Sequence, residues 1–305
     1  MLLCAATKVC RRCAFALGVL VASCAGSPSG WQPGTLSKAQ ADACRAAERA
    51  YRAEAADYQV RRDELAADPV TASWLVRMFV RDLFTVREGR PLGEDQDLLR
   101  AAARIVDPVE SRALAEIQAL GAAAVPTLVG DLLLHSQPQP RELGIELLTR
   151  VGAPAMPALQ EVARTGEPRQ RRAAARALGA IGVDQNVFAT LHQLTGDEDY
   201  SVRADALRSL RGGGEAAQNL LIERLRDDAD PFVRRVAAQS LAAFSGRAPA
   251  MALIDYLERC KRERDFPGEQ AAQASLQKMA AARGPRTPDA WRAFARGLSD
   301  PTGPR

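Results

Sequence analysis

The residues best placed to do chemistry are pairs of one acid and one arginine that recur in the second half of the chain. The pairs, each four residues apart, are Glu167 and Arg171, Asp199 and Arg203, and Asp230 and Arg234. Residues four apart share one face of a helix, so each pair can form an ion pair. The two interpretations are a stripe that binds anions and a structural ladder that ties neighbouring units together. We expect the ladder, because each arginine has its own counter-charge, and the aspartates can also cap their helices.

Metal and nucleophilic chemistry have little support in the residue pattern. The two histidines, His135 and His192, lie in no His-Glu pair and near no cysteine at ligand spacing. The chain has no Gly-x-Ser-x-Gly elbow and no phosphate-cradling glycine-rich loop, and its Gly-Gly-Gly run at 212–214 falls at a predicted turn between helices. We therefore expect no catalytic residue, no metal and no cofactor.

The first 24 residues have the pattern of a secretion signal. Three basic residues between positions 8 and 12 precede ten small or apolar residues at 13–22. Ten residues of helix rise about 15 Å, roughly half the hydrocarbon thickness, so the stretch is too short to span a membrane. It ends Leu20-Val-Ala-Ser-Cys24, which resembles the lipobox of bacterial lipoproteins. The resemblance implies cleavage before Cys24 and lipidation of its sulfur; an ordinary signal is the alternative.

Composition bears on the class of partner and on the cysteines. The leader holds three of the 41 basic residues and no acid, which leaves 38 basic against 37 acidic residues. A near-neutral mature chain gives no case for nucleic acid or an anionic membrane surface as partner. Four of the six cysteines belong to the leader, and only Cys44 and Cys260 remain. We expect both to be unpaired, because a repeat array would hold them far apart.

A repeat of about 31 residues organises most of the chain. Apolar residues recur at this spacing at Ile117, Leu148, Leu178, Leu210 and Leu241. A fixed period of this size, with helical spacing inside each unit, is typical of a solenoid of stacked helix pairs.

Glycine and proline mark the turn inside each unit. Gly121 and Gly152 fall where a first helix must stop, since glycine accepts a positive φ. Pro126 and Pro157 fall in the first turn of the second helix, where the missing N–H costs nothing.

The units resemble a known repeat. The runs at 120–128, 199–210 and 230–241 carry the motifs, the last reading Asp-Pro-Phe-Val-Arg-Arg-Val-Ala-Ala-Gln-Ser-Leu. They are similar to HEAT repeats, specifically the short HEAT-like kind of the phycobilin lyases. The resemblance covers 107–262 well and 268–298 weakly. It implies an all-α, right-handed α-solenoid of about five to six helix pairs.

The segment before the repeats is predicted to be helical. A stripe of small residues and tyrosines runs along one long helix over 36–66. A second helix over 70–86 carries an aromatic face, and we expect it to cap the first repeat; a partner-binding or membrane-surface helix is the alternative. The predicted segments are the signal peptide 1–23, a flexible tether 24–35, the N-terminal helical region 36–106, the repeats 107–262 and a divergent last repeat with a tail 263–305.

These patterns predict a function class rather than a partner. We expect a non-enzymatic protein–protein interaction scaffold, lipid-anchored in the bacterial cell envelope and facing the periplasm. Alanine at position 25 favours the outer membrane by the sorting rule of enteric bacteria. The alternatives are a HEAT-like lyase or another ligand-modifying enzyme, and a purely structural envelope lipoprotein. A lyase would need the cytosol, and the leader argues against that.

The partner, an unidentified envelope protein or peptide, is expected on the second helices of the units. The resemblance implies that those helices line the concave side of the array. Their outward positions also differ in chemistry from unit to unit, unlike the ladder. The candidates are Gln160, Glu161, Gln185, Asn186, His192, Asn219, Glu223, Arg224, Asp255, Glu258 and Arg259.

Overall fold

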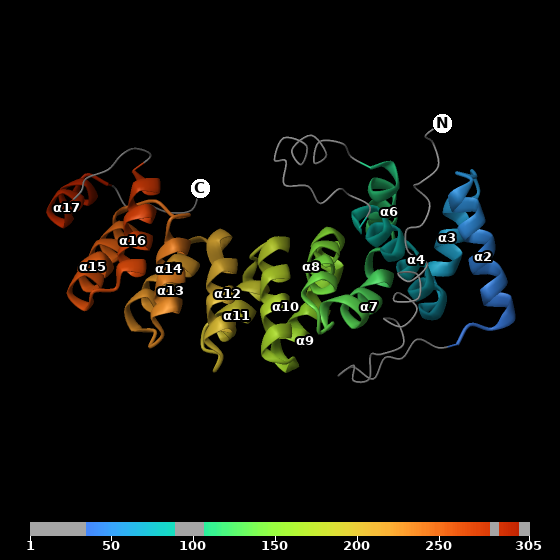
Figure 1. Cartoon of the computed structure of the whole chain (residues 1–305), viewed down its shortest axis with the longest axis horizontal. Helices are drawn as coiled ribbons and strands as arrows, with labels where there is room; N and C mark the ends of the chain where they lie inside the picture. The colour runs from blue at the N-terminus through green and yellow to red at the C-terminus, as the bar shows by residue number, and fades with distance from the viewer. Residues whose placement is uncertain (1–34, 89–106, 281–286, 299–305) are drawn as a thin grey trace, which may run out of the picture. The chain divides into compact units, whose positions relative to one another are not determined.

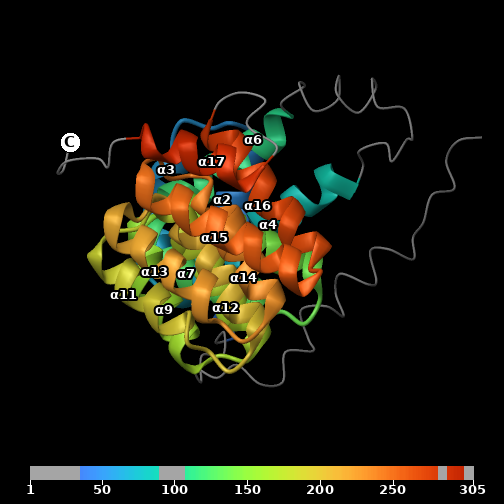
Figure 2. The ribbon, with the colours of Figure 1, turned by 90° about the vertical axis from the view of Figure 1, so that its left-hand side faces the viewer.

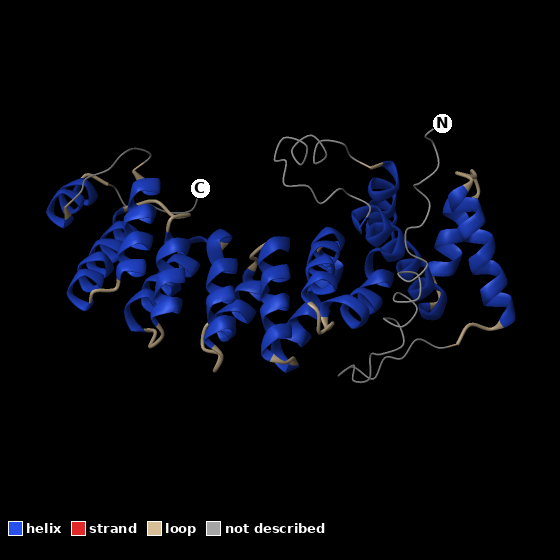
Figure 3. Cartoon of the chain, viewed as in Figure 1, coloured by secondary structure: helices blue, strands red, loops and turns tan. Residues whose placement is uncertain are grey.

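Helices make up all the regular structure in the described part of the chain. The computed structural model describes residues 35–88, 107–280 and 287–298. Figure 3 shows only helices and loops in these ranges, with no strand. This confirms the predicted all-α fold class. The signal segment 1–23 and Cys24 lie outside the described residues.

The chain divides into two compact units, and the division falls inside the predicted repeat region. Unit 1 ends at Gly144 and unit 2 begins at Ile145. In unit 1 the helices are α2 (Lys38–Arg52), α3 (Tyr58–Ala66), α4 (Pro69–Glu88), α6 (Pro108–Leu120), the turn η1 (Gly121–Ala124), α7 (Val125–Thr127), the π-helical turn η2 (Leu128–Leu133) and the first half of α8 (Pro138–Val151).

The single long helix predicted over 36–66 is wrong. The chain leaves the helix after Arg52, and Glu54 takes a positive φ of 52° before α3 begins at Tyr58. The turn lets α2 and α3 pack on each other and on α4. It also brings the rings of Tyr51 and Tyr58 to 5.3 Å between centroids, both buried. Burial of both tyrosines in one small core offsets the cost of the turn.

Helix α4 covers the first repeat, as the sequence predicts. It packs against α6, η1 and α7. Leu75, Met78 and Phe79 are at most 2% exposed, so the apolar face is the buried face. Trp74 and Phe84 remain partly exposed.

One helical run in unit 1, Pro108–Leu133, is long and apolar enough to cross a membrane by length and composition. The run is not one straight helix, because Gly121 takes a φ of 53° between α6 and the second helix of the repeat. Ile117, Leu128 and Leu133 are fully buried within it. The apolar composition therefore serves the core of the first repeat.

Unit 2 is a stack of helix pairs in two layers. The first helices of the pairs are α10 (Pro168–Ile181), α12 (Tyr200–Ser209), α14 (Pro231–Leu241) and α16 (Phe266–Met279). The second helices are α9 (Met156–Thr165), α11 (Gln185–Leu194), α13 (Gly214–Asp227), α15 (Arg247–Glu263) and α17 (Pro288–Arg296). Figure 1 shows the succession of pairs, and Figure 2, which looks along the stack, separates the two layers.

The divergent last repeat forms in unit 2. Helix α16 packs on α14 and α15, and α17 packs on α15. Leu276 and Trp291, two of its predicted apolar positions, are at most 1% exposed.

The repeat leucines and the turn residues behave as predicted. Side chains at the five periodic positions are buried, and all five residues are 0% exposed. Gly152 has a φ of 75°, a conformation that an L side chain rarely adopts, where the first helix of its pair ends. Pro157 lies in the first turn of α9.

The layer of first helices is the more closely packed layer of unit 2. Helices α10, α12, α14 and α16 each contact the next extensively, whereas successive second helices touch less. Between α10 and α12 the approach requires glycine, because a Cβ at Gly179 would lie 2.8 Å from the Cα of Ser209. The expectation that the second helices line the concave side stays a prediction.

Candidate functional site

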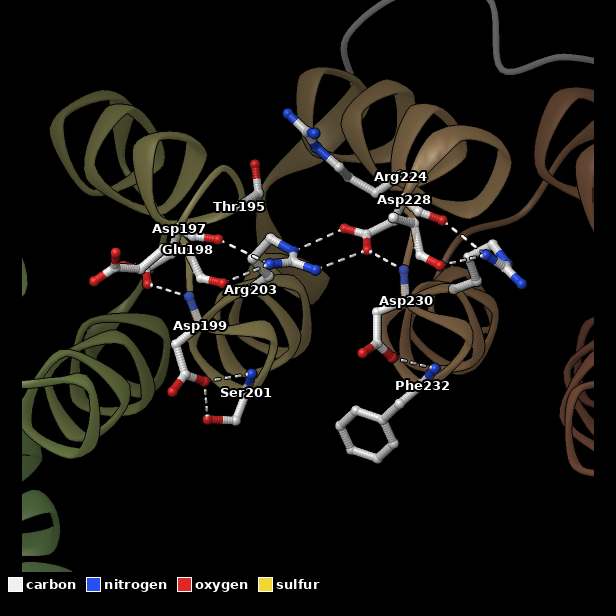
Figure 4. Close-up of polar contacts among 12 residues, drawn as sticks. Thr195, Asp197, Glu198, Asp199, Ser201, Arg203, Arg224, Asp228, Asp230 and Phe232 are labelled. Carbon is white, nitrogen blue, oxygen red and sulfur yellow. Dashed lines mark hydrogen bonds and ion pairs between the residues drawn. The ribbon is translucent and has the colours of Figure 1, made fainter.

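Two of the ladder arginines, Arg171 and Arg203, each bind a carboxylate in the loop that leads to the following repeat. Arg171 in α10 donates from Nε and Nη2 to the two oxygens of Asp197, both at 2.7 Å. Arg203 in α12 makes the same bidentate contact with Asp228, at 3.0 Å for both bonds (Figure 4). The expected counter-charge, the acid four residues earlier, is not the partner in these contacts. The ladder thus crosses between repeats rather than running along single helices.

The two partner aspartates were missed by the sequence reasoning. Asp197 and Asp228 lie in the loops that lead into α12 and α14. Their side chains are 8% and 3% exposed. Each also accepts the backbone N–H two residues later, at 2.9 Å, so its carboxylate shapes the loop as well. The hydrogen bonds to these carboxylates raise the pKa of Arg171 and of Arg203 above the usual range.

The acids of the predicted pairs have a different task. Asp199 and Asp230 cap their helices, each accepting a backbone N–H at 2.7 Å, from Ser201 and Phe232 respectively. The hydroxyl of Ser201 also donates to Asp199, and this bond holds the pKa of that carboxyl below its ordinary value. Glu167 pairs with Arg169 at 2.7 Å on the surface.

The same arginines hold the loop in front of their own helix. Nη1 of Arg171 donates to the carbonyl of Gly166, and Nη1 of Arg203 donates to that of Asp197, both at 2.9 Å. In unit 1, Arg141 donates to the carbonyl of His135 at 3.0 Å in the same way. Arg141 has no acid four residues earlier, so the search for pairs overlooked it, although its spacing to Arg171 is that of the repeat.

The last ladder arginine, Arg234, makes a longer contact with its carboxylate partner. Arg234 is 6% exposed and donates to the carbonyl of Asp228 at 2.8 Å. Its carboxylate partner is Glu263, at 3.8 Å, and its Nε is buried with no hydrogen-bond partner. A glutamate in α15 thus replaces the loop aspartate of the earlier rungs.

The residues predicted to bind a partner lie on the layer of second helices. Gln185, Asn186, His192, Asn219 and Asp255 are exposed. The ring of His192 stacks on that of Phe188, with centroids 6.0 Å apart.

Several of the other candidates already contact residues of unit 2. Glu258 forms a 2.6 Å ion pair with Arg292 and so links α15 to α17. Arg259 donates to the carbonyl of Arg226 at 2.8 Å. The remaining contacts join Gln160 to Thr190, Glu161 to Arg164 and Glu223 to Arg224.

A pocket on the layer of first helices was not predicted. It encloses about 460 Å³ and is lined by Arg172, Tyr200, Ser201, Arg208, Asp230 and Phe232. Tyr200 precedes the ladder residue Arg203 by three positions, and Phe232 precedes Arg234 by two. An aromatic residue at the exposed start of two successive first helices was the available signal. We call this site the aromatic–arginine pocket.

Among the described residues, no group of three or more His, Cys, Asp or Glu side chains is placed to hold a metal ion. Cys44 and Cys260 are both buried and unpaired, as expected from the sequence.

Comparison with known proteins identifies the repeat. A family model described as HEAT repeats matches the chain in three overlapping windows, at residues 125–211, 157–242 and 188–277. Together the windows cover half of the chain, from α7 to most of α16. No curated protein matches the chain. From the matched windows, the stacked helix pairs and the repeated arginine contacts, we conclude that this chain belongs to the HEAT-repeat family.

Proposed function

We propose that this protein is a non-enzymatic scaffold that binds another protein of the bacterial cell envelope. HEAT repeats form a fold of the protein-interaction kind, with extended helical surfaces. The observation that carries the proposal is the direction of the ladder contacts. Arg171 and Arg203 use their donors inside the array, on loops and on buried aspartates. The helix faces, with side chains that differ from repeat to repeat, are left for a partner.

A crosslinking experiment in cells tests the scaffold proposal. A photoreactive amino acid is placed at Asn219, exposed on the second helix α13, and in a separate variant at Gln239, exposed on the first helix α14. We expect discrete protein adducts from at least one of the two positions after irradiation. Absence of adducts from both would contradict the scaffold and favour the purely structural alternative. Charge reversal at Glu223 and Arg224 then reports whether the second helices carry the contact.

The anchoring of this scaffold rests on the leader. We propose that Cys24 is lipidated, from the basic start, the ten-residue apolar stretch and the residues that precede the cysteine. More than one acyl chain would give firm anchoring, because each buried methylene contributes about 0.8 kcal/mol. The anchor would place the array on the periplasmic side of an envelope membrane, with the outer membrane favoured.

Metabolic labelling with an alkyne palmitate tests the anchor. The wild-type protein should carry the label and Cys24→Ala should lose it. Cys44→Ala, a change at a buried cysteine of α2, is the matched control and should keep the label. Equal labelling of Cys24→Ala and wild type would show that the lipobox interpretation is wrong.

A further inference from the structure

The aromatic–arginine pocket combines two partly exposed arginines with the exposed ring of Tyr200 and the partly exposed ring of Phe232. Its lining residues come from α10, from both ends of α12, and from the start of α14 with the residue that caps it, on the layer of first helices of unit 2. None of its arginines belongs to the ladder. In Figure 4 the ring of Phe232 points away from Arg203 and Asp228, so the pocket lies apart from the arginine–aspartate contacts, although the ladder residue Asp230 lines it.

One buried carboxylate, that of Asp205, binds both arginines of the pocket. Asp205 is 3% exposed and accepts from Nε of Arg172 at 2.7 Å and from Nη1 of Arg208 at 2.5 Å, one bond on each oxygen. The two arginine side chains are 44% and 38% exposed. A guanidinium has five N–H donors, so both keep donors for a ligand. The two arginines thus share the negative charge of Asp205, and Asp230 is the one acid among the residues that line the pocket.

The aromatic residues provide an apolar wall beside these cations. Tyr200 is 50% exposed, and its ring meets that of Phe232 edge to face, with centroids 5.9 Å apart. The guanidiniums of Arg208 and Arg235 lie 5.5 and 5.3 Å from the centroid of Phe232. Arg235 has no ion pair among the described residues, so its positive charge adds to that of the pocket.

We propose that the aromatic–arginine pocket binds an acidic segment of the partner protein. A glutamate or aspartate of that segment would accept from Arg172 and Arg208, and an apolar side chain beside it would pack on Tyr200 and Phe232. The proposal rests on the proposed scaffold function and names the surface and the chemistry of the partner. It also moves the expected contact from the second helices to the first helices.

A carboxylate fits this pocket better than a phosphate. Asp230 lines the pocket, and its carboxylate would repel a dianion more strongly than a singly charged group. Asp199, near Arg172, adds a second negative charge at the rim. The near-neutral balance of the mature chain also argues against a nucleic-acid backbone.

The test uses two fluorescein-labelled octapeptides and the full chain. Each peptide contains two leucines. In one peptide a glutamate stands next to each leucine, and in the other peptide a glutamine replaces each glutamate. We expect the glutamate peptide to bind at least about tenfold more tightly by fluorescence anisotropy. Arg208→Gln and Tyr200→Ala should each weaken its binding about tenfold. Arg226→Gln, which removes the same charge from an exposed position of α13, is the matched control and should bind as wild type does.

Each other outcome overturns the proposal. Equal binding of the two peptides, or no binding of either, would exclude recognition of a carboxylate. An effect of Arg226→Gln as large as that of Arg208→Gln would mean non-specific attraction. Inorganic phosphate that displaces the peptide at a lower concentration than acetate would indicate a phosphate site. Thermal melting of each variant shows whether it is folded, and Tyr200→Ala, at a half-exposed position, tests the pocket without touching Asp205.

Failure of the pocket and failure of the scaffold are distinguishable. One result separates the two: adducts form from Asn219 or Gln239 in the Tyr200→Ala variant, and the wild-type protein binds neither peptide. This result would support the scaffold function and exclude binding of an acidic segment in the aromatic–arginine pocket.

Discussion

Arg203 in α12 joins two successive loops of the array: its Nε and Nη2 bind the carboxylate of Asp228, while its Nη1 binds the carbonyl of Asp197. The same side chain therefore fixes the loop before its own helix and the loop that leads to the next. Because Asp228 is almost fully buried, its charge depends on this one arginine for a partner. The relationship couples the register of one repeat to that of the following one.

Removal of this arginine should destabilise unit 2 strongly. Arg203→Ala leaves the buried Asp228 without its partner, which costs about 3–5 kcal/mol for a charge of this kind. Arg203→Lys keeps the charge but cannot make the bidentate contact, so we expect an intermediate loss. Urea unfolding followed by circular dichroism measures both. Arg164→Ala removes an exposed ion pair with Glu161 and should cost at most about 1 kcal/mol. A loss for Arg203→Ala no larger than that of the control would show that the ladder is not structural.

The close approach of α10 and α12 predicts a second effect. In Gly179→Ala the new Cβ would clash with the backbone of Ser209, and overpacking of this kind costs about 1–3 kcal/mol. Gly212→Ala is the matched control, because a Cβ there meets no atom within 4 Å. The melting temperature should fall for Gly179→Ala alone. Unchanged melting in both variants would mean that the two helices do not meet closely at this point.

The sequence predicted the parts of the fold that depend on local pattern. Leu178 and Leu241 are inward because helical spacing and the repeat period agree at those positions. The turn after Arg52 has no such signal, since neither glycine nor proline marks it, and Glu54 takes a positive φ where the two tyrosines pack together. Local propensity and tertiary packing conflicted there, and packing decided the structure.

The ladder and the pocket show a second limit of sequence reasoning. A search for residues four apart detects pairs within one helix, whereas the partner of Arg171 lies 26 residues away, across the stack. That distance follows from how repeats are packed and is not visible in either helix alone. The same holds for Arg172 and Asp205, which are 33 residues apart and meet only when α10 and α12 pack together.

Truncation of the repeat leucines tests the core. Leu178 and Leu241 are fully buried in equivalent first helices, α10 and α14. Alanine at either position should cost about 2–5 kcal/mol, through lost burial and the cavity that remains. Gln239→Ala, on the exposed face of α14, should change the free energy of unfolding by less than about 0.5 kcal/mol. Values near zero for both leucines would show that the assigned helical register is wrong.

Burial of the two thiols predicts slow alkylation and a specific dependence on pH. Burial raises the pKa of Cys260 from the ordinary 9.0 to about 11, and it raises the pKa of Cys44 as well. The thiolate reacts and the thiol does not, so iodoacetamide at about pH 9 should label both cysteines in urea but neither in the native protein. Mass spectrometry of the alkylated peptides measures this. Native labelling at the rate of free cysteine would contradict the buried positions.

The sign of the effect on stability follows from the raised pKa. The fold disfavours the Cys260 thiolate, so its contribution is complete below the ordinary pKa near 9.0 and is lost as the pH rises toward about 11. Cys260→Ala removes this titration. Between about pH 8 and about pH 10, the free energy of unfolding should therefore fall less in Cys260→Ala than in wild type. The comparison is made with Tyr256→Phe in both proteins, because the pKa of Tyr256 is raised by burial and by its interaction with Cys260, and would therefore change in Cys260→Ala. An equal fall in both proteins would show that the Cys260 thiol is not held neutral by the fold.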